Sequence, residues 1–362
     1  RTGNALPFLV RRIDYPCRKL VIFKVISPIS QEFVDTLPMS AIVAALTHTL
    51  QRWNAEGRIA IALSGGMDSM VLLDAASNQI ADYPQNRFEA IHIHHGLSPN
   101  ADVWANFCER ECDMRGLPLT VVRVAIKRAD VEGQGIEAAA RAARYRAFIA
   151  SGAAFVVTAQ HADDQAETVL HQLLRGTGWA GLAGMGEMRE LSPQTRLVRP
   201  FLHLDCAEIE QYAKDHQLAW IEDESNDDAA FTRNFLRQYV VPPIAQRFPH
   251  FRASLARAAR HAAQADRMLE ALARIDLQWS GHTARAELLD NLPEERQINA
   301  LYHWLHGQGI TPPSQTQLAE WARQLFRVPP GDRPHQAGGH DLLIVRKRGV
   351  LSLKRSNRDD PA

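Results

Sequence analysis

Short β-rich segments alternate with helical ones from Ile59 to Ala159, and this alternation constrains the fold more than any other feature of the chain. Strands separated by helices pair in parallel, because each helix carries the chain back across the sheet before the next strand begins. The expected strands are Ile59–Leu63, Phe88–Ile93, Leu117–Val124 and Ala154–Ala159. The expected helices are Ser69–Ile80, Ala101–Arg115 and Ile136–Ala150. We therefore predict an α/β fold in which a parallel sheet carries helices on both faces.

A change of pattern near residue 240 predicts a second, smaller and mainly helical domain. Before it, a helix at Cys206–His216 leads to an expected fifth strand at Ala219–Ile221, and the pair Pro242-Pro243, which cannot continue a helix, marks the boundary. Beyond it we expect helices at 251–279, 294–306 and 315–326, a turn-rich piece at 329–339 and a hairpin at 341–353. The predicted parts are an extension at 1–38, a main α/β domain at 39–243 and a mainly helical domain at 244–362.

Composition excludes several classes of protein. With 362 residues, 46% of them hydrophobic and 23% charged, the chain has the composition of a soluble globular protein. The longest apolar candidate, Leu20–Ile29, contains Lys24, is too short for a membrane helix and lacks a clean secretory cleavage pattern. The 4 cysteines form no Cys-x-x-Cys pair, so we expect neither a disulfide framework nor a zinc ribbon, and a cytoplasmic location.

Charge is balanced over the whole chain but not along it. The 41 Lys and Arg residues match 41 Asp and Glu residues, which leaves no net field to attract a polyanion. Two long stretches, 229–265 and 342–358, nevertheless hold several basic residues and no acidic one. Such runs occur on solvated faces, but in a neutral protein they favour contact with a phosphate backbone.

The strongest local motif is a strand, a glycine turn and a helix. Ile59–Leu63 runs directly into Ser64-Gly-Gly-Met-Asp-Ser69 and then into an apolar helical stretch. The two glycines let backbone N–H groups approach an anion, the two serines add hydroxyl donors, and the helix points its positive end at the same place. No lysine follows to reach the outer phosphates, but Asp68 offers a carboxylate for hydrated Mg²⁺. A plain tight turn that caps a helix is the structural alternative.

A histidine and several acidic residues open the helix after the fourth expected strand, in His161-Ala-Asp-Asp-Gln-Ala-Glu-Thr168. Open α/β sheets bind ligands at this edge. Asp164 and Glu167 share a helical face, so their carboxylates can hold an ammonium group or a metal. Acidic residues that only offset the helix dipole, with His161 beside the cap, explain the same pattern without a ligand.

Two further patterns have both a functional and a structural interpretation. His92, His94 and His95 end the second expected strand and look like a metal cluster, although strand alternation puts His95 on the opposite side from the other two. A glycine-rich connection at 175–186 suits a mobile lid, and simple chain reversal explains it equally well.

Two groups of arginines are candidates for contact with nucleic acid. Glu137 and Arg141 stand at i, i+4 with Arg144 beside them, which fits either a surface ion-pair ladder or a face toward RNA. Arg233 and Arg237 stand four positions apart, and guanidinium groups at that spacing suit phosphate or carboxylate.

Together these segments resemble the PP-loop (N-type) ATP pyrophosphatases and, within them, the tRNA(Ile)-lysidine synthetase family. The resemblance covers about Ile59 to Pro243 and extends more loosely into the second domain. The matching motifs are Ser64-Gly-Gly-Met-Asp-Ser69, Ile91-His-Ile-His-His-Gly-Leu97, Glu137-Ala-Ala-Ala-Arg-Ala-Ala-Arg-Tyr145, His161-Ala-Asp-Asp-Gln-Ala-Glu-Thr168, Arg175-Gly-Thr-Gly178, Arg199-Pro200, Asp223-Glu-Ser-Asn226 and Arg233-Asn-Phe-Leu-Arg237. The glycine loop alone does not distinguish this family, because several synthetases and tRNA thiolases share it. The acidic helix at His161–Thr168 and the motif Arg233-Asn-Phe-Leu-Arg237 are the features that narrow the resemblance.

The resemblance implies an adenine nucleotide alpha hydrolase-like fold and a carbon–nitrogen ligase. ATP would adenylate the wobble cytidine, position 34, of tRNA(Ile) with a CAU anticodon at C2 and release pyrophosphate, and the ε-amino group of free lysine would then displace AMP to give lysidine. ATP and Mg²⁺ are the implied cofactors, and tRNA(Ile) and lysine the implied partners. The chain stops soon after the hairpin, so we expect the tRNA acceptor end to be recognised by other means. The oligomeric state, a homodimer included, stays open.

The resemblance also assigns roles by position. The residues that would bind ATP are Ser64, Gly65, Gly66, Met67, Asp68, Ser69 and His92, with Asp68 also holding Mg²⁺. Asp164 and Glu167, with His161, would face lysine. Arg233 would assist lysine or the reacting base. The remaining substrate contacts would be Arg237, Arg141 and Arg144. Asp68, Asp164, Glu167 and Arg233 would carry the catalysis.

Three alternatives compete with this interpretation. A tRNA thiolase generally needs cysteines near the active site, whereas Cys108 and Cys112 are expected on a helix away from the glycine loop. A nucleotide-binding RNA-binding module without chemistry would leave Asp164 and Glu167 idle. A metal phosphohydrolase built on His161 and Asp164 lacks evident further ligands.

Overall fold

The computed structural model describes residues 40–126, 135–224, 228–229, 231–327, 335–338 and 342–355, so the predicted extension at 1–38 lies outside the described residues. The chain divides into two compact units. Unit 1 comprises Arg1–Gln165 and Gly186–Val240, and unit 2 comprises Ala166–Met185 and Val241–Ala362. Unit 2 thus takes a segment, 166–185, that the predicted boundary at residue 243 leaves in the first domain.

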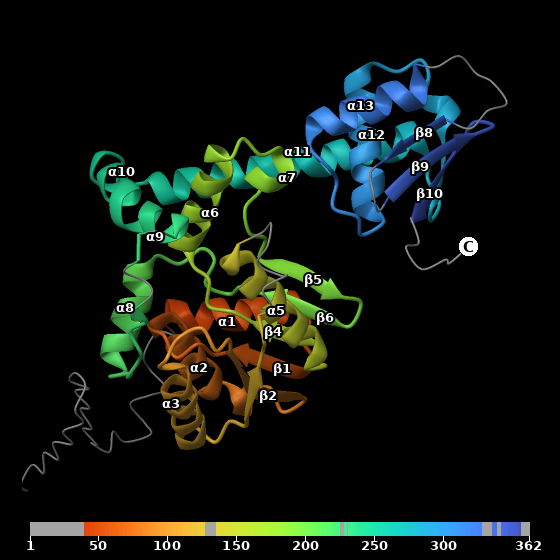
Figure 1. The fold of residues 1–362 in the computed structure, drawn as a ribbon. Coiled ribbons are helices and arrows are strands. Elements are labelled where there is room, and N and C mark those ends of the chain that lie inside the picture. The colour runs from red at the N-terminus through yellow and green to blue at the C-terminus, as the bar shows by residue number, and fades with distance from the viewer. Residues whose placement is uncertain are drawn as a thin grey trace, which may run out of the picture. The chain divides into compact units, whose positions relative to one another are not determined.

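Unit 1 is built on a 6-stranded sheet with the order β3-β2-β1-β4-β6-β5 (Figure 1). The strands are β1 (Gly57–Ala62), β2 (Asn86–His94), β3 (Leu119–Arg123), β4 (Phe155–Val157), β5 (Met188–Ser192) and β6 (Thr195–Val198). All neighbouring strands pair in parallel except β5, which pairs antiparallel with β6 at the edge. The four expected strands and their parallel pairing are confirmed.

The expected fifth strand at Ala219–Ile221 was wrong. These residues form no strand, and the Ile221 N–H instead donates to the Gly65 carbonyl at 2.8 Å. The fifth parallel strand is β6, which pairs with β4 and is reached through the β5 hairpin. The hairpin is not evident in the sequence because its strands are short and their burial does not alternate regularly.

Helices cover both faces of the unit 1 sheet, as predicted. The helices of unit 1 are α1 (Ala41–Arg52), α2 (Met67–Ser77), α3 (Ala101–Met114), α5 (Ile136–Ala150), the start of α6 (Ala162–Leu174), α8 (Cys206–Asp215) and α9 (Thr232–Phe235). Alternation along β1 divides the core: Ile59 and Ile61 face a cluster that includes residues of α1, α2, α3 and α8, whereas Ala60 faces a cluster with Phe148 of α5. Burial on both faces explains the apolar sequence of β4 and of residues 59–61 in β1, all of which are buried.

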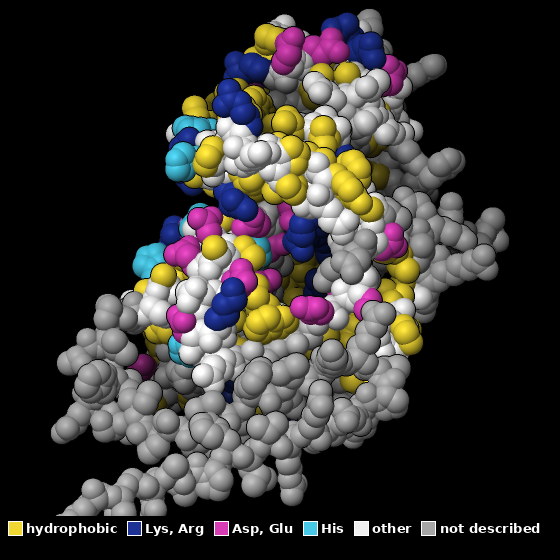
Figure 2. Space-filling view, turned by 90° about the vertical axis from the view of Figure 1, so that its left-hand side faces the viewer, with side chains coloured by type: hydrophobic (Ala, Val, Ile, Leu, Met, Phe, Trp, Pro, Cys, Tyr) yellow, Lys and Arg dark blue, Asp and Glu magenta, His cyan; other side chains and the backbone are white. Residues whose placement is uncertain are grey.

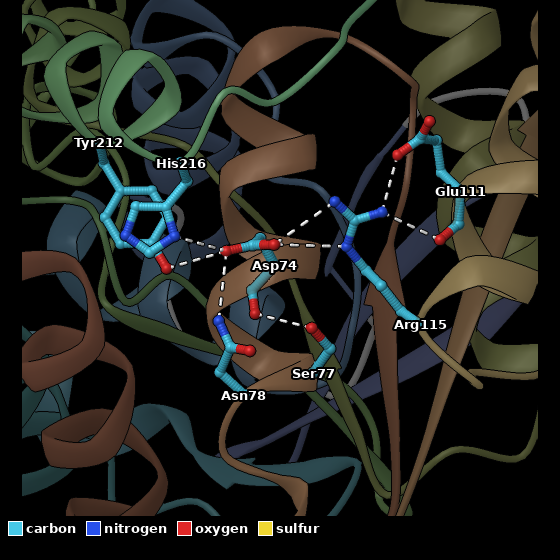
Figure 3. A network of polar contacts seen from close by, with 7 residues as sticks. All are labelled: Asp74, Ser77, Asn78, Glu111, Arg115, Tyr212 and His216. Atoms are coloured by element: carbon cyan, nitrogen blue, oxygen red, sulfur yellow. Dashed lines mark hydrogen bonds and ion pairs between the residues drawn. The ribbon is translucent and has the colours of Figure 1, made fainter. Parts of the chain in front are cut away.

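A partly buried carboxylate, that of Asp74 in α2, links three of these helices (Figure 3). Arg115 at the end of α3 lies 3.4 Å from Asp74 Oδ1, while the Tyr212 hydroxyl and His216 Nδ1, from α8, each lie 3.1 Å from Oδ2. The Tyr212 and His216 rings stack with centroids 3.8 Å apart. This network fixes the far end of α2, the helix whose first turn follows the glycine loop.

Unit 2 combines helices with a second sheet (Figure 1). Its helices are the remainder of α6, α7 (Trp179–Leu182), α10 (Val241–Arg247), α11 (Phe251–Leu277), α12 (Glu294–Gly307) and α13 (Gln315–Phe326). Its 4-stranded antiparallel sheet has the order β7-β10-β9-β8, from β7 (Thr283–Arg285), β8 (His335–Gly338), β9 (Leu342–Lys347) and β10 (Val350–Arg355). The glycine-rich connection includes α7, which packs against α11.

The predictions for this unit were right about the long helices and the hairpin but missed half of the sheet. The hairpin is β9–β10, and β7 and β8 flank it. Pro242 and Pro243 do not stop a helix: they lie in the first turn of α10, where a missing N–H costs no hydrogen bond. Among the described residues, no helix is both long and apolar enough to cross a membrane.

Candidate active site

The glycine loop after β1 is closed around one serine hydroxyl. Ser69 Oγ accepts the N–H groups of Ser64 and Gly65, both at 3.2 Å, and donates to the Gly66 carbonyl at 2.9 Å. Gly65 has φ +90°, and a Cβ there would lie 2.8 Å from Cδ1 of Ile221, so only glycine fits. The loop thereby places the first N–H groups of α2, which have no acceptor within the helix, at the carboxyl edge of the sheet.

A histidine surrounded by carboxylates lies beside this loop. His161 is buried, with Nε2 3.6 Å from both Asp68 Oδ2 and Asp164 Oδ2 and Nδ1 3.7 Å from Asp163 Oδ2. Burial lowers the pKa of His161, but the hydrogen bonds and charges of these aspartates outweigh it and raise the pKa to about 11. The group is an imidazolium held among carboxylates. The sequence analysis gave no role to Asp163.

Asp68 can hold a hard cation. Its Oδ1 is buried and has no hydrogen-bond partner among the described residues. Mg²⁺ prefers oxygen ligands and keeps several waters or phosphate oxygens, so one carboxylate oxygen in this position fits it. The neighbouring donors, His161 and the thiol of Cys206, are not ligands that Mg²⁺ selects. Cys206 is a second residue that the sequence analysis missed here.

The two carboxylates predicted to face lysine differ in their surroundings. Asp164 Oδ2 accepts the His161 N–H at 3.1 Å, and its Oδ1 lies 3.4 Å from Arg237, so Asp164 both caps α6 and pairs with an arginine. Glu167 lies on the same helix but belongs to unit 2 and is 2% exposed. Their joint role toward lysine stays a prediction.

The three histidines at the end of β2 contact different partners. His92 is buried with Nδ1 2.8 Å from the Leu63 carbonyl, and burial lowers its pKa. His94 Nε2 lies 3.2 Å from Asp102. Burial and nearby positive charges lower the pKa of His95 to about 4. The structure therefore does not gather them around one point, and the role of His92 toward ATP stays a prediction.

The predicted arginines of two distant segments do meet in unit 1. Arg141 and Arg233 lie 3.7 and 3.9 Å from the same Glu137 carboxylate oxygen. Desolvation lowers the pKa of Arg144, and the positive charges of Arg141 and Arg233 act in the same direction. Arg141 and Arg233 thus contact one carboxylate, and the charges of both act on Arg144. A group of guanidinium side chains of this kind suits an anion.

Exposed aromatic rings accompany these arginines. Phe235 and Tyr239 are 46% and 60% exposed, with ring centroids 5.6 Å apart, at the π-helical turn Leu236–Val240. In unit 2, Arg247 lies over the ring of Phe248 at 5.5 Å. Figure 2 views the side that carries α10 and shows Lys, Arg and His side chains beside hydrophobic ones. Arginines next to exposed rings are typical of surfaces that bind single-stranded RNA. The aromatic residues inside the acid-free run were the signal that the sequence analysis overlooked.

The second acid-free run has one buried arginine, whereas Lys347, Arg348 and Lys354 are exposed, and its contact with a phosphate backbone stays a prediction. Arg346 of β9 is 9% exposed, and its guanidinium forms two hydrogen bonds with the Asp290 carboxylate, at 2.6 and 2.7 Å. This arginine stabilises unit 2 rather than facing a partner. The end of the run, after Arg355, lies outside the described residues.

The expectation that Cys108 lies away from the glycine loop was wrong. Its Sγ would be 3.3 Å from a Cβ on Gly65. Cys108 is nevertheless fully buried, and burial raises the pKa of its thiol to about 12 and that of Cys112 to about 11. Burial therefore disfavours the thiolate form of both side chains, the form that acts in sulfur transfer.

Comparisons with known proteins agree with this geometry. A family model described as a PP-loop domain matches residues 38–244, and one described as a TilS substrate binding domain matches residues 285–352. A U34-tRNA thiolase from Methanococcus maripaludis shares the fold, with a TM-score of 0.53 at 16% identity over 61% of this chain and 77% of that chain. The chain is a PP-loop protein.

Curated relatives identify the family within the PP-loop proteins to which this chain belongs. A tRNA(Ile)-lysidine synthase of Burkholderia pseudomallei is 48% identical over 74% of this chain and 55% of its own length. The tRNA(Ile)-lysidine synthase of Shigella flexneri is 44% identical over 75% of this chain and 64% of its own length. That of Serratia proteamaculans is 42% identical over 82% of this chain and 69% of its own length. The chain belongs to the tRNA(Ile)-lysidine synthase family. It spans little more than half the length of the first of these relatives.

Proposed function

We propose that this chain joins free lysine to C2 of the wobble cytidine of tRNA(Ile) with a CAU anticodon, in the cytoplasm, using ATP and releasing AMP and pyrophosphate. The carrying observation is the phosphate-type loop of unit 1 with the Asp68–His161 cluster directly beside it. Support also comes from relatives named tRNA(Ile)-lysidine synthase and from the match to a TilS substrate binding domain.

In the first step, the glycine loop and the first turn of α2 would bind the ATP phosphates. The N–H groups of Ser64 and Gly65 already donate to Ser69 Oγ, so the anion would be met by the N–H groups of the first turn of α2, which have no acceptor within the helix. Asp68 would hold Mg²⁺ through its unpartnered Oδ1, and Mg²⁺ neutralises charge on the phosphates. The oxygen on C2 of cytidine attacks the α-phosphorus, and the bond to pyrophosphate breaks. The positive charge of His161 offsets the aspartates that would otherwise repel the nucleotide.

In the second step, Asp164 and Glu167 would orient the lysine ammonium group. The ε-amine gives a proton to this carboxylate pair and attacks C2, and the bond between C2 and the AMP oxygen breaks. Orientation of two bound reactants is a large part of such catalysis. Arg237, 3.4 Å from Asp164, would hold that carboxylate in place.

The RNA would be held through phosphates and bases. Arg141, Arg144 and Arg233 form the cationic group that suits a phosphate near the reacting base. The exposed rings of Phe235 and Tyr239 suit stacking of unpaired anticodon-loop bases.

The test is product analysis with the full chain. Mg·ATP is incubated with lysine and unmodified tRNA(Ile), singly and together, and AMP, pyrophosphate and the tRNA nucleosides are measured by chromatography and mass spectrometry. We expect a lysine adduct on cytidine only in the complete mixture, none with tRNA(Met), and none with Asp68→Asn, which keeps the shape but removes the charge. AMP release without a lysine adduct would overturn the proposal.

A further inference from the structure

Three side chains of different chemistry meet at the mouth of the glycine loop. Asp68 comes from the first turn of α2, His161 directly precedes α6 and Cys206 is the first residue of α8. One ligand atom from each, a carboxylate oxygen, an imidazole nitrogen and the thiol sulfur, lies within 4.8 Å of the other two. All three belong to unit 1.

The spacing is close to that of ligands on one metal ion. Ligands at about 2.1 Å from a tetrahedral zinc ion are about 3.4 Å apart. His161 Nε2 and Asp68 Oδ2 are already 3.6 Å apart. Cys206 lies at the start of a helix, where rotation about its Cα–Cβ bond can bring the sulfur to the same point.

Asp163 contacts two of the candidate ligands. Its backbone N–H donates to His161 Nδ1 at 3.3 Å, and its Oδ2 lies 3.7 Å from the same nitrogen. The same carboxylate oxygen accepts the Cys206 N–H at 3.3 Å. One aspartate therefore positions two of the three ligands.

The donor set selects the kind of ion. Sulfur and imidazole nitrogen favour Zn²⁺ and related ions over Mg²⁺, which binds oxygen almost exclusively. Three protein ligands leave the fourth tetrahedral position open, which is the form of an accessible rather than a closed zinc site. Asp68 is 37% exposed, so an ion can enter from solvent.

We propose that Asp68, His161 and Cys206 form a site for Zn²⁺ or another thiophilic divalent ion, and that this ion competes with Mg·ATP because both use Asp68. Binding releases the proton of the thiol and that of the imidazole to solvent. The zinc site stands independently of the reaction assigned above, and only the competition rests on that proposed function.

The experiment measures metal binding without tRNA or lysine. The full chain, reduced and stripped of metal, is titrated with Zn²⁺ against a chromogenic chelator, and with Co²⁺ while absorbance is recorded. We expect one tightly bound Zn²⁺ that Cys206→Ser weakens by at least about 100-fold, since loss of an outer-sphere partner alone costs about 10- to 100-fold. We also expect a near-ultraviolet sulfur-to-cobalt band that Cys206→Ser abolishes and the control Cys17→Ser retains.

Two results would overturn the site: equal Zn²⁺ affinity in wild type and Cys206→Ser, or a cobalt spectrum without the sulfur band. Circular dichroism and thermal unfolding of Cys206→Ser exclude loss of folding as the cause, and Cys206→Ala provides a second variant. Competition is tested separately by adding Mg²⁺ with a non-hydrolysable ATP analogue. Displacement of Zn²⁺ is expected, and simultaneous binding of both would overturn the competition while leaving the metal site intact.

Discussion

Replacing Gly65 by alanine should destabilise unit 1 far more than the same change at Gly66. Gly65 has φ +90°, where an L-residue costs about 1–2 kcal/mol. Its new Cβ would also lie 2.8 Å from Cδ1 of Ile221, and relieving such overpacking costs about 1–3 kcal/mol. The two costs together predict a loss of about 2–5 kcal/mol in the free energy of unfolding.

Gly66 is a matched control in the same loop. It has an extended backbone, φ −74° and ψ 162°, and its Cβ would meet nothing closer than 3.5 Å. As an N-cap position it should lose about 1 kcal/mol or less on mutation to alanine. The two variants and wild type are compared by urea unfolding with Mg²⁺ present and no nucleotide.

A third variant separates backbone strain from the clash. Ile221→Val removes Cδ1, the atom that the new Cβ would approach. In the Gly65→Ala background this change should therefore be more favourable to the free energy of unfolding, by about 1 kcal/mol, than it is in wild type, as measured by a double-mutant cycle. Equal losses for Gly65→Ala and Gly66→Ala would refute the strain argument, and a cycle with no coupling would refute the clash.

Further expectations concern charge and pH. Burial raises the Asp74 pKa, but the hydrogen bond from His216 and the contacts of Asp74 with its other partners outweigh burial and lower the pKa below 3.8. The charged form of Asp74 therefore stabilises the fold above about pH 4. This stabilisation is lost as the pH falls through the lower pKa of the folded state. Asp74→Asn should therefore cost about 1.5–3 kcal/mol in urea unfolding at pH 7 and little in strong acid. His95 has a pKa of about 4 instead of 6.5, so wild-type stability should fall as pH drops from 6.5 toward 4, and His95→Gln should flatten that fall. Glu167→Ala should abolish lysine-dependent product while ATP binding, measured by calorimetry, persists. Arg257→Glu should weaken tRNA binding and reduce the slope of log affinity against log salt by about 1.

Each expectation has an outcome that contradicts it. Asp215→Asn removes an exposed carboxylate of unit 1 and should leave the acid dependence of the free energy of unfolding unchanged. If Asp74→Asn and Asp215→Asn had equal effects, the network around Asp74 would not stabilise the fold as described. If Glu167→Ala lowered ATP binding as much as it lowered lysine-dependent product, the proposed role of Glu167 toward lysine would be contradicted. Arg323→Glu on α13 is the charge control for Arg257, and an unchanged salt slope at Arg257 would mark it as a solvated side chain.

Much of the fold was predictable because its signals are local. Apolar runs bounded by turns identified β1 to β4, and helical periodicity identified the helices between them. The β5–β6 hairpin and the strands β7 and β8 were not predicted because each strand is five residues or shorter. In addition, β6 pairs with β4 and β7 with β10, which are distant in sequence. The segment 219–221 was mistaken for a strand because its apolar side chains pack into the core without joining the sheet.

In the candidate site, too, the local features were predictable from the sequence and the long-range contacts were not. The motif of the glycine loop fixed its strand, turn and helix, and its closure around Ser69 follows from contacts within the motif. The meeting of Arg233 with Glu137 and the approach of Cys206 to Asp68 depend on how separate segments pack, which no local spacing encodes. The histidines of β2 show the converse: they are neighbours in sequence, yet burial and different partners separate their chemistry.

The bond from the Ile221 N–H to the Gly65 carbonyl has a consequence for synthesis of the chain. The ribosome makes the glycine loop early, but Ile221, which packs against it, only after α8. Contacts between residues so far apart in sequence form late in folding. A nascent chain would thus carry a loop of the right sequence but without its final support, and would gain full affinity for nucleotide only when nearly all of unit 1 has emerged.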